Sequence, residues 1–176
     1  FKSFANDVII LNNEIVASIN NLDLNRIFDP SWMTVPGNIS VAKDLITESI
    51  SITTKHYSNS MHTLSEAYLS NKLNSFNVNF SQAEYEEFIG AFKAEVEKGS
   101  ERNELLLDIE MKHMDSFGEF VSFIEMNKDY WVAKNGAFIF QRQEDLDEFN
   151  KLVGEIRLIE RMQSQIMLDL RGDFVE

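Results

Sequence analysis

Apolar residues recur every three or four positions along four stretches of the chain, and this spacing predicts four amphipathic helices. The stretches run from Lys2 to Asn21, from Ser40 to Asn71, from Ser81 to about Ile124, and from Glu144 to Leu170. Four long helices of this kind bury their apolar stripes most simply against one another. The predicted fold is therefore all-α, an antiparallel up-down-up-down four-helix bundle that forms a single domain over residues 1–176.

The third helix carries the clearest start signal. Ser81-Gln82-Ala83-Glu84 is a capping-box pattern, in which Ser81 and Glu84 satisfy each other's backbone N–H groups. Its apolar stripe keeps its phase through Gly99-Ser100, which favours one long helix that is kinked or frayed there. Two helices, with Gly99 ending the first and Ser100 capping the second, are the alternative.

Residues 22–38 form the longest irregular stretch. This stretch contains both prolines, Pro30 and Pro36, and also Gly37, all of which interrupt regular structure. It is too apolar for a solvated linker, because six of its side chains need burial: Leu24, Ile27, Phe28, Trp32, Met33 and Val35. We expect an ordered loop that packs on the bundle.

Asn135-Gly136 separates two short runs of strand-forming residues between the third and fourth helices, over residues 130–140. This dipeptide favours a type I′ turn and hence a β-hairpin, because both central residues of that turn need positive φ. The register pairs Trp131 with Phe140 and Ala133 with Phe138 on one face, and Val132 with Ile139 on the other. Both faces are apolar.

In the predicted bundle, the 22–38 loop and the hairpin emerge at the same end, so Trp32 and Trp131 should share one apolar cluster. One interpretation of these aromatic segments is a plug over the end of the core. The other is an exposed surface for a protein partner or a second copy of the chain. The residues of this candidate interaction surface are Trp32, Trp131, Val132, Phe138 and Ile139.

The charge of the chain narrows its possible partners. Asp and Glu outnumber Lys and Arg by 29 to 16, which gives a net charge of −13 that repels nucleic acids and anionic membranes. Apolar runs are far shorter than the roughly 20 residues of a membrane span, so we expect no membrane contact by the domain itself. The absence of Cys excludes disulfides and thiolate chemistry.

Glu110-Met111-Lys112-His113 is the strongest candidate for chemistry, since Glu-x-x-His is the spacing of di-iron helical bundles. Such a site needs the motif twice, and the nearest second copy, residues 160–163, ends in Gln163. We therefore predict a largely buried His113 without a metal, partnered by a backbone carbonyl or by a carboxylate such as Glu160. Neighbouring acids such as Asp145 and Asp147 are interpreted as a solvated face.

These patterns favour a non-enzymatic interaction or sensor module, with no catalytic residues and no cofactor. The alternative is a metal-dependent, di-iron-like enzyme that uses Glu110 and His113. Because the sequence begins at Phe1 rather than Met, we expect a segment upstream, such as a signal peptide or membrane anchor. An extracytoplasmic or membrane-tethered location is favoured over a cytoplasmic one.

Overall fold

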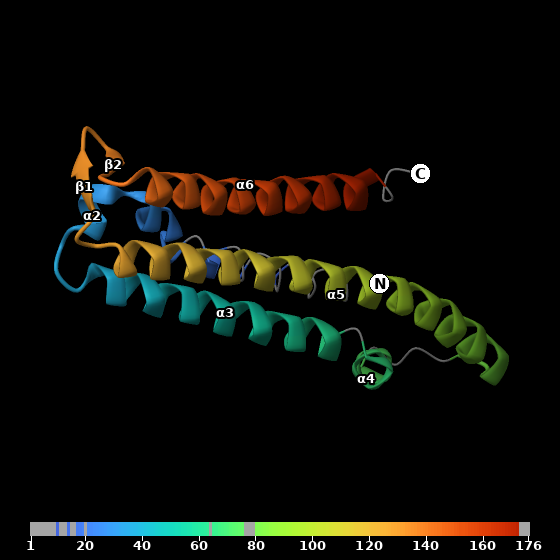
Figure 1. Ribbon diagram of the computed structural model, residues 1–176. Helices are drawn as coiled ribbons and strands as arrows, with labels where there is room; N and C mark the ends of the chain where they lie inside the picture. Colours follow the sequence, from blue (N-terminus) through green and yellow to red (C-terminus); the bar gives the residue numbers. More distant parts are fainter. Residues whose placement is uncertain are drawn as a thin grey trace. The chain divides into compact units, whose positions relative to one another are not determined.

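The computed structural model describes residues 10, 14, 17–19, 21–63, 65–75 and 80–172, which are mostly helical (Figure 1). The elements follow in the order η1 (Leu24–Phe28, a 3₁₀ helix), α2 (Pro30–Met33), α3 (Asn38–Thr63), α4 (Glu66–Ser75), α5 (Gln82–Met126), β1 (Trp131–Lys134), β2 (Ala137–Phe140) and α6 (Gln143–Gly172). Contacts group the chain into two compact units. The first unit contains Ile52–Leu107, and the second contains Ile19–Ser51 and the chain from Asp108 onwards. The single domain stays a prediction.

Helix α5 runs without a break from Gln82 to Met126, which confirms one long helix through Gly99-Ser100. Its capping box is formed as predicted. The Ser81 backbone N–H donates to Glu84 Oε2 (2.8 Å), and the Glu84 N–H donates to Ser81 Oγ (3.3 Å). This reciprocal pair satisfies two of the donors that a helix start leaves open.

The predicted second helix is wrong in one respect, because it divides into α3 and α4. Ser65 begins the second of these: its Oγ accepts a hydrogen bond from the Tyr68 backbone N–H (3.2 Å). A serine at this position competes with the preceding helical turn for backbone donors and so favours a new start. Helix α3 also begins at Asn38 rather than Ser40, directly after Gly37 with its positive φ of 91°.

Residues 22–38 are ordered as predicted, but they form η1 and α2 rather than an irregular loop. Asp29 caps α2 by accepting from the Ser31 backbone N–H (2.8 Å), and Pro30 occupies the first helical position. Ile27 and Met33 are buried. Val35 is half-exposed, so the expectation that it is buried is wrong.

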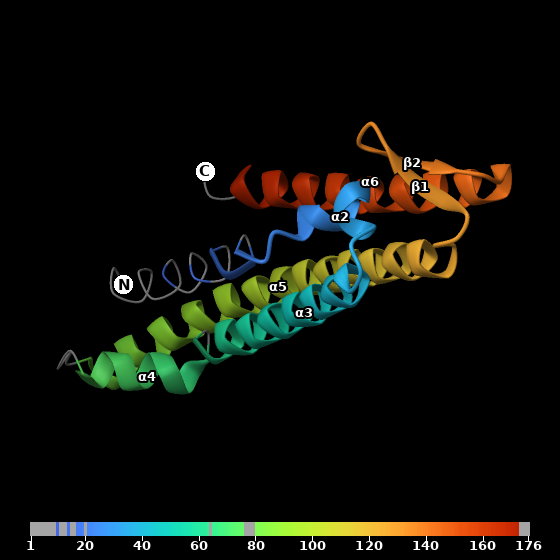
Figure 2. The same cartoon turned by 90° about the vertical axis from the view of Figure 1, so that its left-hand side faces the viewer.

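The main hydrophobic core lies in the second unit, and every element of that unit contributes residues to it or packs against it. Helices α3 and α5 lie side by side there and run antiparallel (Figures 1 and 2), with the Lys43 ammonium 2.6 Å from Glu125 Oε2. The buried cluster consists of Ile27, Met33, Ala42, Ile46, Met114, Phe117, Phe120, Val121, Phe123, Ile124, Trp131, Leu152 and Ile156. Trp32 packs against this cluster, which confirms that the two tryptophans share it.

The predicted first helix falls mostly outside the described residues. Within it, residues 10, 14, 17–19 and 21 are helical, and Ser18 Oγ donates to the Glu14 carbonyl oxygen (2.8 Å). None of the helices, as far as they are described, is both long enough and apolar enough to cross a bilayer.

Candidate functional site

The β-hairpin has the predicted register and turn. Trp131 pairs with Phe140, Val132 with Ile139, and Ala133 with Phe138. Asn135 and Gly136 have φ values of 53° and 74°, the positive angles that the sequence required. The register places successive side chains on opposite faces, so the hairpin has two chemically separate surfaces.

The inner face of the hairpin packs on the core. The Trp131 ring lies 4.9 Å from the Phe138 ring, and Phe138 in turn contacts Phe120 and Phe149 at 6.0 and 5.4 Å between centroids. Trp131 Nε1 donates to the Ile124 carbonyl oxygen (3.0 Å), one of the acceptors left open at the end of α5. Trp131 and Phe138 thus anchor the hairpin and do not form an exposed patch.

The outer face carries the paired Val132 and Ile139 and the paired Lys134 and Ala137, and the exposed Tyr130 directly precedes β1 at the base of the hairpin. Val132 and Ile139 lie opposite each other, with 51% and 45% of their surface exposed, and Tyr130 is 42% exposed. The predicted register placed Val132 and Ile139 together on one face, and the structure shows that this pair is exposed. Of the five predicted surface residues, these two are exposed, Trp32 and Phe138 are half-buried, and Trp131 is buried.

An ion-pair cluster centred on Arg142 closes the base of the hairpin. The Arg142 guanidinium donates to both Asp145 carboxylate oxygens (2.6 and 2.7 Å) and to Asn127 Oδ1 (2.9 Å), and it stacks over the Tyr130 ring at 3.8 Å. These contacts tie the end of α5 to the start of α6. Asp145 is only 5% exposed, so its interpretation as part of a solvated face was wrong.

Glu110 and His113 lie on α5, both partly buried. His113 retains 13% of its side-chain surface, and its Nε2 is 3.9 Å from Glu160 Oε1 on α6, the carboxylate that the sequence suggested. Burial lowers the pKa of His113, while Glu160 opposes that shift; burial raises the pKa of Glu110. In the part of the chain that is described, no three His, Asp or Glu side chains are grouped to hold a metal ion.

The buried imidazole makes stability dependent on pH. Because the folded-state pKa of His113 is lowered, the unfolded chain binds this proton more readily. The free energy of unfolding should therefore fall as the pH drops below about 6.5, the usual pKa of histidine. We expect His113→Gln to show a smaller fall than wild type in urea unfolding between pH 7.5 and 5.5.

The exposed His62 supplies the control for this measurement. His62→Gln makes the same substitution at an exposed position, and contributions from Glu110 and from the half-buried His56 are common to all three proteins. An unchanged pH dependence in His113→Gln would contradict a buried, neutral imidazole.

Comparison with known proteins identifies no relative of this chain. No protein-family model matches the chain, and no curated protein or solved structure matches it. The proposed function therefore rests on the hairpin and its surroundings.

Proposed function

We propose that the chain is a non-enzymatic interaction or sensor module, which contacts another protein or a second copy of itself through the outer face of the hairpin. The observation that carries this proposal is the half-exposed pair Val132 and Ile139, on a hairpin whose opposite face is fixed in the core. A rigid, preorganised apolar surface loses little conformational entropy on binding.

The composition of the outer face supports the same proposal. Tyrosine and apolar side chains are typical of the central part of protein interfaces. Tyr130 is held in place by the Arg142 guanidinium, so the aromatic ring is oriented before any partner arrives.

We also propose that the helices form an up-down-up-down four-helix bundle. It is supported by the antiparallel pairing of α3 with α5 and by the contact of His113 with Glu160 between α5 and α6. The predicted helix over residues 2–21 would supply the fourth member. We also propose the extracytoplasmic or membrane-tethered location given above.

The double variant Val132→Thr/Ile139→Thr tests the contact surface. Threonine keeps the β-branched shape that strands favour, while a hydroxyl replaces a methyl group of Val132 and the ethyl group of Ile139. We expect wild-type protein to associate with itself or with its partner, and the double variant to lose at least tenfold in affinity. Sedimentation velocity over a concentration series measures self-association, and isothermal titration measures partner binding.

Val35→Thr/Val41→Thr is the matched control, since both valines are exposed apolar residues of the same unit outside the hairpin. This control should associate like wild type. Circular dichroism should show the same helix content in all three proteins. If the hairpin variant associates as strongly as wild type with its fold intact, the hairpin is a plug and the proposal is wrong.

A further inference from the structure

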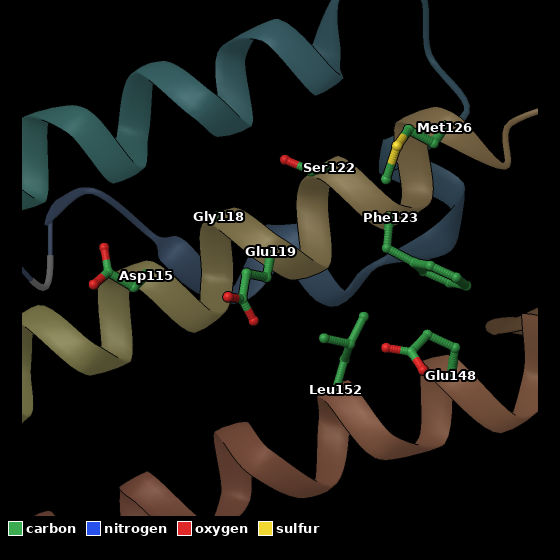
Figure 3. A pocket seen from close by; sticks show the side chains of 8 residues that line it. All are labelled: Asp115, Gly118, Glu119, Ser122, Phe123, Met126, Glu148 and Leu152. Atoms are coloured by element: carbon green, nitrogen blue, oxygen red, sulfur yellow. The ribbon is translucent and has the colours of Figure 1, made fainter.

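A groove of about 660 Å³ opens between α5 and α6 in the second unit (Figure 3). Its floor is apolar: Phe123 from α5 and Leu152 from α6 point towards each other across the space between the helices. Met126, which is 75% exposed, lies at the end of the groove. A flexible thioether beside an apolar floor can adapt to side chains of different shape.

The rim of this groove is acidic. Asp115 and Glu119 come from α5 and Glu148 comes from α6, and the Glu119 side chain points towards α6 (Figure 3). The lining residues, all of them described, include no Lys, Arg or His. An apolar floor between carboxylates is complementary to a ligand that is both apolar and cationic.

The surroundings of Lys151 show that the carboxylates at the rim stabilise a positive charge. Its ammonium lies 3.0 Å from Glu148 Oε1. That hydrogen bond raises the pKa of Lys151, and the charges of Glu148, Glu155 and Glu119 raise it further. The side chain of Lys151 is 60% exposed, so an incoming cation can compete with it for Glu148.

We propose that this groove binds a basic amphipathic segment of a partner protein. Arginine or lysine side chains of the segment contact Glu119 and Glu148, and flanking apolar side chains lie on Phe123 and Leu152. A groove between two helices is a common receptor for an amphipathic helix. The net charge of −13 draws such a segment towards the chain, and the groove selects it by shape. This contact is independent of the hairpin's outer face.

The probe is a fluorescein-labelled peptide of leucine and arginine, spaced to form one apolar and one basic helix face. A second peptide carries glutamate in place of arginine. Fluorescence anisotropy at low ionic strength measures binding to the full chain. We expect the basic peptide to bind, the acidic peptide not to bind, and added salt to weaken the complex.

Charge variants give opposite shifts in affinity. Glu119→Gln should weaken binding about two- to fivefold, because it removes one rim carboxylate. Lys151→Gln should strengthen binding by a similar factor, because it releases Glu148 from its internal partner. The controls Glu48→Gln and Lys43→Gln change the net charge equally at residues outside the groove, so they should shift affinity less.

A steric variant tests the groove itself. No heavy atom lies within 4 Å of a Cβ added at Gly118, which lines the groove, so a side chain at this position starts in open space and Gly118→Leu introduces bulk into the groove. It should lower affinity more than tenfold, while Gly154→Leu, an equally open helical position outside the lining, should not. Equal effects of the groove variants and their controls would overturn the proposal, as would equal binding of both peptides.

Discussion

Phe120→Ala should lower the free energy of unfolding by about 3–5 kcal/mol, the typical result of truncating a buried phenylalanine. Phe120 is fully buried on α5, and its ring contacts three elements that are distant in sequence. The centroids of Phe28, Phe138 and Phe149 lie 5.0, 6.0 and 5.7 Å away. Alanine would leave a cavity that these rings cannot all move to fill.

Urea unfolding followed by circular dichroism measures this loss. Leu158→Ala is the control, because Leu158 is an exposed residue of α6 and its truncation should change stability by less than about 0.5 kcal/mol. A loss below about 1 kcal/mol in Phe120→Ala would mean that the aromatic cluster is not the centre of the core.

Ile27→Ala should lower the free energy of unfolding by about 2–5 kcal/mol, although Ile27 lies outside the long helices. The residue is fully buried in η1 and belongs to the main core cluster. The segment over residues 22–38 thus contributes to stability like a core element. A linker of the same length would tolerate this change.

The half-exposed Val35 in the same segment provides the comparison for Ile27. Val35→Ala should stay within about 0.5 kcal/mol of wild type in the same urea titration. If both variants were equally stable, the segment would lie on the surface without supporting the core.

Features encoded by neighbouring residues could be predicted from the sequence. The turn at Asn135-Gly136 and the capping box at Ser81 both depend on contacts within four residues, and both were predicted correctly. The start of α4 at Glu66, which Ser65 caps, is equally local. It was missed because Ser65, within a stripe that mixes apolar and polar residues, is also compatible with one continuous helix.

Features that depend on distant residues could not be predicted in this way. Asp145 has the sequence context of an exposed acid at a helix start, and it is buried because Arg142 bridges it to Asn127, the residue that follows the end of α5. The acidic groove likewise needs α5 and α6 to be placed side by side before Glu119 and Glu148 can face one ligand. The predicted bundle made these two helices neighbours, but sequence spacing alone does not show which of their side chains line a common groove.

The two faces of the hairpin differ in how much substitution the fold tolerates. Trp131 and Phe138 are fixed by the core, and Arg142 ties the base of the hairpin independently of its outer residues. Substitutions at Val132 and Ile139 can therefore accumulate without endangering the fold. Under the proposed function, two positions can therefore change binding specificity while the scaffold stays the same.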